Sequence, residues 1–256
     1  MARQQNIEKL SVAAPAYNEA QGIRQIVETW HSFLKNEPCL KSFEIVICND
    51  GSKDATGEIL DQLALEFPQF KVVHHKKNKG AATALSTAIQ HTTGDWILLL
   101  DCDGQFPIVN FEHFHKTLLD NPAYAYIGVR LQKKDSWFAR FGSWASGSVC
   151  NLCFRTRYRD FNSACKLVDG KVLRWLHLES RGLNYSTDIT AKLIEAGFAP
   201  VEVVIIHDKR QQGKSHRTLI RSTLHRLLFV SYLISRQILF SLGILQRPSE
   251  MEHRPY

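Results

Sequence analysis

Residues 96–105 read WILLLDCDGQ, and the interpretation of the chain starts from this stretch. Five apolar residues in a row are typical of a short strand that is buried on both faces, as in a parallel sheet. Residues i and i+2 of an extended segment face the same side, so the side chains of Asp101 and Asp103 are expected to lie together. The stretch therefore predicts a buried strand that ends in a pair of carboxylates.

On both sides of this stretch, apolar runs alternate with segments of helical periodicity. The predicted strands cover residues 10–14, 43–48, 71–74, 96–100 and 124–129. The predicted helices cover residues 22–35, 54–66, 81–90 and 111–119, and a further helix begins near residue 185. This alternation predicts the α/β class, with a mostly parallel, Rossmann-like sheet covered by helices.

Polar loops follow three of the predicted strands. Residues 15–19 read PAYNE, residues 49–52 read NDGS with Asp54 close behind, and the carboxylate pair follows the fourth strand. Each loop alone is explained as a turn, because Asn, Asp, Gly and Pro are the usual turn residues. Ligands of such sheets bind beyond the carboxyl ends of the strands, so three polar loops at one edge favour a binding site.

The carboxylate pair predicts a metal. Asp101 and Asp103 repel each other unless a cation lies between them, and oxygen ligands suit Mg²⁺ or Mn²⁺. Gln105 offers a further, neutral oxygen. Magnesium usually bridges to substrate phosphates, so we expect a ligand that carries a diphosphate. The phosphatase loop of haloacid dehalogenases is a weaker alternative, because that family places its motif on the first strand.

Four motifs together resemble the inverting GT-A glycosyltransferases that include dolichol-phosphate mannosyltransferases and bacterial polyprenyl-phosphate glycosyltransferases. They are residues 15–19, residues 49–54, the NKG of residues 78–80, and residues 101–105. The resemblance runs from about residue 11 to about residue 215. It implies a GT-A fold and a reaction in which a sugar leaves a nucleotide diphosphate.

The resemblance also implies roles for residues on the donor side. Asp50 would accept a hydrogen bond from the base, and Asp101 would contact the ribose or the sugar. The implied nucleotide-binding residues are Pro15, Tyr17, Glu19, Asp50, Lys79 and Asp101. The implied metal ligands are Asp101, Asp103 and Gln105, with Mg²⁺ or Mn²⁺ as the cofactor. One departure is Asn49, which stands where the family usually has a second carboxylate beside Asp50.

Other positions match the acceptor side of the family. Residues 159–163, RDFNS, resemble a segment near the acceptor, and residues 210–215, RQQGKS, resemble a loop that closes over the diphosphate. The implied phosphate- and acceptor-binding residues are Arg130, Arg140, Ser163, Arg210, Lys214, Ser215 and His216. His216 stands where the family has lysine, and residues 164–166 read ACK in place of the usual GFR. The implied catalytic residues are Asp101, Asp103, Asp188 and Arg130.

The role of Asp188 depends on the acceptor. A hydroxyl acceptor needs a general base, and Asp188 matches the family's acidic position. A phosphate monoester has a second pKa of about 6, so at neutral pH it attacks without losing a proton. It needs cations to hold it, preferably arginine. Residues 130–159 contain seven Lys or Arg against the single acid Asp135, which favours a phosphate acceptor.

The charge pattern favours a membrane surface. The chain carries a formal net charge of +7, of which residues 207–256 contribute nine Lys or Arg against three Asp or Glu. Residues 219–242 predict a basic amphipathic helix, and Trp137, Phe141 and Trp144 share one helical face. A core helix and a dimerisation helix are the alternatives for these segments. We divide the chain into a GT-A domain, residues 1–206, and a basic, membrane-associating segment, residues 207–256.

Composition excludes other classes. With 44% hydrophobic and 22% charged residues, the chain is neither a disordered tail nor a fibre. The single CxxC, at Cys150 and Cys153, has no second pair to complete a zinc site, and no apolar run is long enough to span a bilayer. The N-terminus lacks the apolar core of a signal peptide, so we expect a cytoplasmic protein that is peripheral to the membrane.

These observations predict a metal-dependent glycosyltransferase. It would move a hexose, with inversion, from a nucleotide-diphosphate sugar to a polyprenyl phosphate of the dolichyl or undecaprenyl kind. A sugar or lipid hydroxyl acceptor, with Asp188 as the base, is the alternative within enzymes. A non-catalytic basic binder of membrane or nucleic acid is the alternative outside them, and since no nucleic-acid-binding signature is present we expect no nucleic-acid partner.

Overall fold

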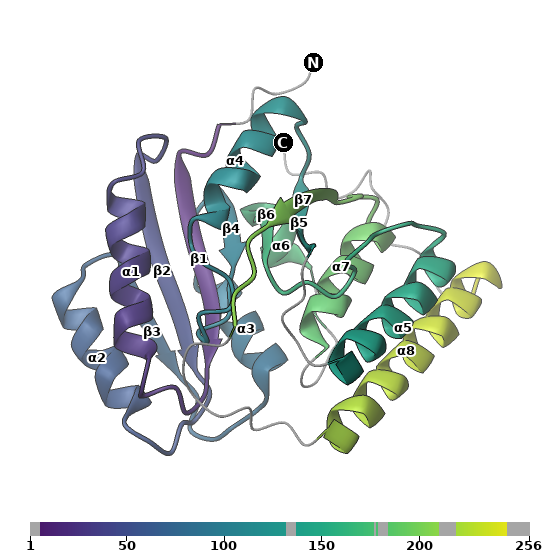
Figure 1. Cartoon of the computed structure of the whole chain (residues 1–256), viewed down its shortest axis with the longest axis horizontal. Coiled ribbons are helices and arrows are strands. Elements are labelled where there is room, and N and C mark those ends of the chain that lie inside the picture. The colour runs from purple at the N-terminus through teal and green to yellow at the C-terminus, as the bar shows by residue number, and fades with distance from the viewer. Residues whose placement is uncertain (1–5, 132–136, 177, 179–183, 210–218, 245–256) are drawn as a thin grey trace.

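The computed structural model describes residues 6–131, 137–176, 178, 184–209 and 219–244 (Figure 1). The strands are β1 (Lys9–Ala16), β2 (Ser42–Asn49), β3 (Phe70–His74), β4 (Trp96–Leu99), β5 (Ala125–Arg130), β6 (Lys166–Asp169) and β7 (Val201–Ile205). The helices are α1 (Ile23–Lys35), α2 (Thr56–Glu66), α3 (Ala81–Gln90), α4 (Asn110–Asp120), α5 (Trp137–Phe154), α6 (Gly170–Trp175), α7 (Tyr185–Glu195) and α8 (Leu219–Ser241).

The strands form one sheet in the order β3-β2-β1-β4-β6-β5-β7. Every neighbouring pair is parallel except those that involve β6, which runs antiparallel to both β4 and β5. The predicted mostly parallel α/β sheet is therefore confirmed. Because β6 is reversed, its first residues lie at the edge where its two neighbours end. The predicted strands did not include β6 or β7.

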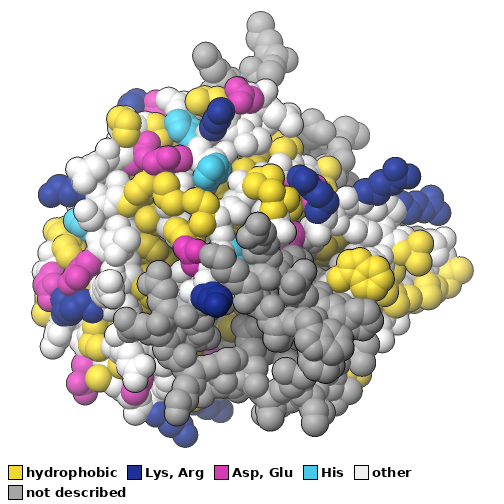
Figure 2. Space-filling view, viewed as in Figure 1, with side chains coloured by type: hydrophobic (Ala, Val, Ile, Leu, Met, Phe, Trp, Pro, Cys, Tyr) yellow, Lys and Arg dark blue, Asp and Glu magenta, His cyan; other side chains and the backbone are white. Residues whose placement is uncertain are grey.

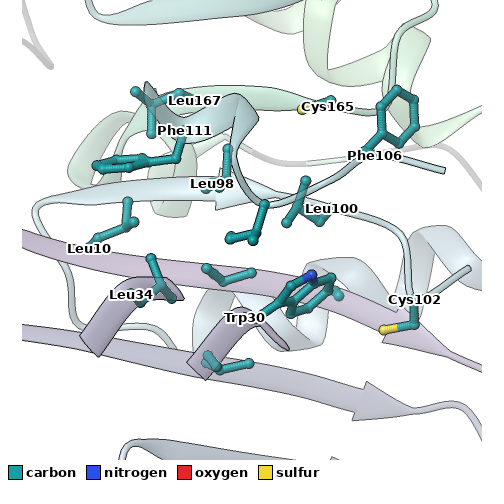
Figure 3. Close-up of a cluster of buried hydrophobic side chains, with 14 of the residues drawn as sticks. Leu10, Trp30, Leu34, Leu98, Leu100, Cys102, Phe106, Phe111, Cys165 and Leu167 are labelled. Carbon is teal, nitrogen blue, oxygen red and sulfur yellow. The ribbon is translucent and has the colours of Figure 1, made fainter. Parts of the chain in front are cut away.

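Apolar side chains fill both faces of the sheet. On one face, α1, α2 and α4 pack on alternate strand residues, and Figure 3 shows Trp30 and Leu34 of α1 close to Leu98 and Leu100. On the other face, α3, α6 and α7 pack on the intervening residues. All four residues of β4 are buried, as the apolar run predicts. Burial on both faces leaves the strand ends as the place for polar chemistry.

The start of α2 differs from the prediction. The helix begins at Thr56, two residues later than the apolar periodicity indicates. The carboxylate of Asp54 explains the difference, because its Oδ1 accepts hydrogen bonds from the Thr56 amide at 3.1 Å and from the Thr56 hydroxyl at 2.5 Å. Its Oδ2 accepts a hydrogen bond from the Ala20 amide at 3.2 Å and ties the first loop to the second.

Helices α5 and α8 lie side by side at one end of the molecule (Figure 1). A small apolar cluster that includes Cys150, Ala191 and Val230 joins them to α7. The buried carboxylate of Glu195 accepts hydrogen bonds from Arg236 at 3.0 Å and from Gln237 at 3.0 Å. Arg236, which interrupts the apolar sequence of α8, therefore fastens this helix to the fold. The domain division at residue 206 stays a prediction.

A buried carboxylate at the amino ends of the strands joins three segments. Glu44 accepts a hydrogen bond from the Ser11 hydroxyl at 2.6 Å, from the Lys71 ammonium at 2.6 Å, and from the amide and hydroxyl of Thr93. Burial by itself raises the pKa of Glu44, but the hydrogen bonds from Lys71, Ser11 and Thr93 outweigh it and lower the pKa to about 2. The charged form is thus the stabilising one.

We predict that Glu44→Gln lowers the free energy of unfolding at pH 7 by roughly 2–3 kcal/mol, because it removes charge-assisted hydrogen bonds. The folded pKa of Glu44 lies below the unfolded value, so its contribution is complete above pH 4.5 and is lost as the pH falls toward about 2. Urea unfolding of both proteins between pH 7 and pH 3 measures the difference. A difference that does not shrink in acid contradicts the assignment.

A matched control is Glu8→Gln. Glu8 pairs with Lys41 at 2.8 Å, but both side chains are exposed. An exposed pair contributes between about 0 and 1 kcal/mol, so this variant should unfold nearly as the parent does.

Candidate active site

The first two polar loops are held together at the carboxyl edge of the sheet. Ala16 at the end of β1 is in register with Asn49 at the end of β2. The Asn18 amide donates a hydrogen bond to the Ser52 hydroxyl at 3.0 Å, and the Asn18 side chain accepts one from the Lys53 amide at 2.8 Å. Asn18 has a positive φ of 55°, a conformation that asparagine tolerates better than most residues. The predicted juxtaposition of these loops is present.

The predicted nucleotide-binding residues lie on this edge with different exposures. Pro15, Tyr17 and Glu19 are half-buried and Lys79 is exposed. Asp50, in contrast, is only 1% exposed. Its carboxylate accepts hydrogen bonds from the amides of Lys79 and Gly80, at 2.9 and 2.8 Å. Asp50 therefore holds the loop that precedes α3, and its contact with a base stays a prediction.

Glycine is required where these loops touch. Gly51 has a φ of +66°, and a Cβ atom at this position would lie 2.6 Å from the carbonyl carbon of Lys77. Gly80, with a φ of 94°, precedes the first residue of α3. Both positions lie in the left-handed region that favours glycine. The loops that carry the NDGS and NKG motifs are thus packed directly against each other.

The carboxylate pair lies just beyond β4, as predicted. Asp101 and Asp103 are both half-buried. The hydroxyl of Tyr185 donates a short hydrogen bond to Asp101 Oδ1, and the Gln105 amide donates one to Asp103 Oδ1 at 3.0 Å. The Gln105 carbonyl in turn accepts a hydrogen bond from the Asp208 amide at 2.8 Å. The start of α7 and the segment after β7 therefore position this loop.

Cys102, between the two aspartates, is buried in the core. Burial, with help from the carboxylates of Asp101, Glu19 and Asp103, raises the pKa of its thiol. All six cysteines are free. Cys102 therefore serves as a small apolar side chain that anchors the loop.

The donor set suits a hard cation that also binds a substrate. Within the described part of the chain, no group of three or more His, Cys, Asp and Glu side chains is arranged to hold a metal. Two carboxylates and an amide oxygen nevertheless fit Mg²⁺ or Mn²⁺, because such ions keep positions for waters and substrate phosphates. The residues present therefore fit an ion that is held jointly by the protein and a diphosphate.

Arg130, at the end of β5, is brought to the predicted acceptor segment. Its guanidinium donates two hydrogen bonds to the carboxylate of Asp160, from Nε at 2.7 Å and from an Nη at 3.1 Å. It also lies 5.9 Å from the ring centre of Phe106. The Asp160 side chain is 1% exposed and that of Arg130 is 11% exposed. A planar two-point contact of this kind fixes the direction of the guanidinium.

The rest of the RDFNS segment is attached to the start of α7. The Thr187 hydroxyl donates a hydrogen bond to Asn162 Oδ1 at 2.7 Å, and the Thr190 hydroxyl donates one to the Phe161 carbonyl at 3.0 Å. Asp188, in the first turn of the same helix, is fully buried. The structure thus brings the predicted acidic position to the acceptor segment, but beneath the surface.

Two buried polar groups lie at the start of β6. Ser163 is fully buried, and in the described residues its hydroxyl has no hydrogen-bond partner. Lys166 is also fully buried, and its ammonium donates a hydrogen bond to the Ser163 carbonyl. Burial lowers the pKa of Lys166 to about 7, while Asp160 opposes that shift. Sequence reasoning missed Lys166, although its place in the ACK departure from the family pattern was a signal.

Five predicted positions are not described at the level of their side chains. Arg140 lies on α5, and its side chain is outside the described part of the structure. Arg210, Lys214, Ser215 and His216 lie in a segment, residues 210–218, that is outside the described residues altogether. Their roles stay predictions. The residues that sequence reasoning missed are His75, Lys166, Tyr185 and Thr187, and for Asp160, which lies in the predicted acceptor segment, it missed the pairing with Arg130.

The sheet order and the acidic pair beyond β4 agree with the GT-A fold expected from the sequence. The chain belongs to glycosyl transferase family 2, because the model of that family matches residues 11–177. Glucosyl-3-phosphoglycerate synthase from Mycobacterium tuberculosis, solved with Mn²⁺ and uridine-diphosphate-glucose, has the same fold. The TM-score is 0.66 at 15% identity, over 90% of this chain and 79% of that one.

Two relatives are polyprenyl-phosphate sugar transferases by name. A dolichyl-phosphate beta-glucosyltransferase of Trichomonas vaginalis is 38% identical over 112 residues, which is 43% of this chain and 35% of that protein. The alignment with this chain therefore spans about a third of the length of the Trichomonas vaginalis protein. An undecaprenyl-phosphate 4-deoxy-4-formamido-L-arabinose transferase of Edwardsiella ictaluri is 26% identical over 84% of this chain and 65% of that protein.

We predict that Asp160→Asn lowers the free energy of unfolding by about 3 kcal/mol or more, because it leaves the guanidinium of Arg130 without its buried counter-charge. The matched control is Glu202→Gln. Glu202 pairs with Arg159 at 3.1 Å, and the Arg159 side chain is 57% exposed. The control should lower the free energy of unfolding by less than about 1 kcal/mol. Urea unfolding measures both, and equal losses would contradict the assignment.

Proposed function

We propose that this protein transfers a hexose, with inversion, from a nucleotide-diphosphate sugar to a polyprenyl phosphate. The observation that carries the proposal is the arrangement at the carboxyl edge of the sheet. Asp101 and Asp103 follow β4, while Arg130 ends β5, and reversed β6 separates the two strands. A pair of carboxylates for the donor and a partly exposed arginine for an anionic acceptor therefore share one edge. Membership of glycosyl transferase family 2 supports the transfer of a sugar, and the names of the two relatives support a polyprenyl phosphate as the acceptor.

On the donor side, Asp101, Asp103 and Gln105 would hold a divalent cation, Mg²⁺ or Mn²⁺. When bound, such an ion offsets the negative charge that develops on the leaving diphosphate. The Tyr185 hydroxyl orients the carboxylate of Asp101, and the Gln105 amide orients that of Asp103. The nucleotide would lie against Pro15, Tyr17 and Glu19 and against the loop that Asp50 holds. The Mycobacterium tuberculosis enzyme with Mn²⁺ and UDP-glucose supports this assignment.

On the acceptor side, the burial of Asp188 favours a phosphate over a hydroxyl. A general base must come within hydrogen-bond distance of the proton that it removes. Asp188 is fully buried, which suits a structural carboxylate better than a base. A phosphate monoester needs no base at neutral pH, because it is already an anion. Arg130, aimed by Asp160, would supply the cation that positions it.

We predict that Asp103→Asn lowers the rate of sugar transfer by on the order of 100-fold or more, because the site loses charge that the leaving group requires. The measurement is transfer of labelled sugar from UDP-glucose, GDP-mannose or UDP-N-acetylglucosamine to polyprenyl phosphate, with Mg²⁺ or Mn²⁺ added. The control is Asp95→Asn, an exposed aspartate just before β4, which should transfer normally.

The same assay tests the acceptor. Polyprenyl phosphate should be glycosylated, and the parent alcohol, polyprenol, should not. Transfer to the alcohol but not to the phosphate would favour the hydroxyl acceptor instead. Full transfer by Asp103→Asn would contradict the donor site itself.

The acceptor would be reached at a membrane surface. Figure 2 shows hydrophobic side chains gathered at the end of the molecule where α5 and α8 lie. Trp144 is 64% exposed and Leu152 is 80% exposed on α5, and Ile238 and Leu242 are 52% and 65% exposed on and just after α8. In the described part of the chain, no helix has both the length and the apolar character needed to cross a bilayer. Peripheral attachment therefore suits this surface, and the net charge of +7 suits anionic lipid.

We predict that the double variant Ile238→Asp, Leu242→Asp reduces co-sedimentation with vesicles of anionic phospholipid by about tenfold or more, because each charge must enter the apolar interface. The control is Leu65→Asp, an exposed leucine on α2 at 89% exposure, which should sediment as the parent does. If the double variant binds vesicles normally, this surface is not the attachment site.

A further inference from the structure

His75 is a buried histidine next to the candidate donor site. It follows the last residue of β3 and is 8% exposed. Its Nδ1 lies 2.8 Å from Asp50 Oδ1, and its Nε2 lies 3.0 Å from the Thr87 hydroxyl on α3. Nε2 also lies 3.5 Å from the Cys48 sulfur. Both ring nitrogens are therefore engaged by the fold.

The hydrogen-bond partners assign the protons of this ring. The carboxylate of Asp50 can only accept a hydrogen bond, so His75 Nδ1 carries the proton of the His75–Asp50 contact. The Thr87 hydroxyl lies 3.0 Å from the Thr83 carbonyl, and when its single proton is donated there, the Thr87 oxygen accepts a hydrogen bond from Nε2. In that arrangement both nitrogens carry a proton, and the ring is an imidazolium.

The neighbouring histidine has a different set of partners. Asn49 Oδ1 accepts a hydrogen bond from the Ser52 amide at 3.2 Å, so its Nδ2 donates to His74 Nδ1 at 3.0 Å. His74 Nε2 then donates to Asp61 at 2.9 Å. One nitrogen accepts and the other donates, so the protein holds His74 as a neutral ring. The two adjacent histidines therefore differ in the number of ring protons because their hydrogen-bond partners differ.

Among the described groups in contact with His75, Asp50 is the one that carries a charge. On β2, burial and the nearby Asp50 raise the pKa of the Cys48 thiol to about 12, so that group stays neutral. On α3 the contact is the uncharged hydroxyl of Thr87. The Lys79 side chain, in the loop between β3 and α3, is exposed. The imidazolium and the carboxylate thus form a pair without net charge beneath the loop.

We propose that His75 is a positioning residue of the donor site, acting through Asp50 on the loop of Lys79 and Gly80; this inference rests on the proposed function. Asp50 holds both amides of that loop, directly before the first residue of α3. The positive charge of His75 cancels that of Asp50. Without it, a buried negative charge lies beneath the loop against which the anionic nucleotide would lie, and repels the nucleotide. His75 therefore influences both the position of this loop and the charge beneath it.

The experiment compares His75→Leu and His75→Gln with the parent, with His74→Gln as the matched control. His75→Leu should raise the KM for the sugar nucleotide about tenfold or more while changing the KM for polyprenyl phosphate and kcat less than about threefold. His75→Gln keeps an N–H donor toward Asp50 and should recover part of the loss. His74→Gln should behave as the parent. Equal effects on both substrates, or no effect of His75→Leu on the donor, would overturn the inference.

A spectroscopic measurement separates this role from a purely structural one. Nitrogen NMR of the labelled parent should show two protonated ring nitrogens for His75 near pH 7 and one for His74. A neutral ring at His75 would overturn the inference even if sugar transfer is confirmed. If the parent transfers no sugar while His75 is an imidazolium, the proposed function fails instead.

Discussion

The parallel, in-register pairing of β1 with β2 and β4 is the constraint on which the rest of the structure depends. Ala16 pairs with Asn49, so β1 and β2 end together, and Leu99 at the end of β4 pairs with Ala13, close to the same edge. Backbone hydrogen bonds keep this alignment, and apolar packing on both faces keeps the strands from slipping by one residue. Polar loops that are far apart in the sequence therefore meet at one edge. The reversed strand β6 adds the residues around Lys166 to the same edge.

Buried charges beneath this edge give the site its rigidity. Asp50 is held with His75, Asp160 with Arg130, and Lys166 with the Ser163 carbonyl. Each buried charge costs desolvation energy and is tolerated because partners of opposite sign or polar groups surround it. Such pairs have one preferred geometry, so the surface groups that they support are aimed before a ligand arrives. This arrangement suits a reaction whose catalysis depends mainly on positioned charge.

The sequence predicts the parallel sheet, the carboxylate pair beyond the fourth strand and the packing of the first two polar loops. Those features depend on local apolar periodicity and on turn residues, which are visible without tertiary contacts. The strand β6 was missed because it has only four residues and begins with a lysine, so its sequence shows no clear alternation or apolar run. The role of His75 and the pairing of Asp160 with Arg130 were missed because they depend on partners 25 and 30 residues away in the sequence. The burial of Asp50 could not be predicted either, because nothing in its polar loop sequence distinguishes a buried aspartate from an exposed one.

The central claim is that the two carboxylates beyond β4 bind a divalent cation together with the diphosphate of a sugar donor. The most direct measurement is a crystal structure of the protein soaked with Mn²⁺ and a nucleotide-diphosphate sugar, with anomalous data collected at the manganese edge. We expect an anomalous peak in contact with Asp101 or Asp103 and with both phosphates. A donor bound elsewhere, or a peak far from these two side chains, would contradict it.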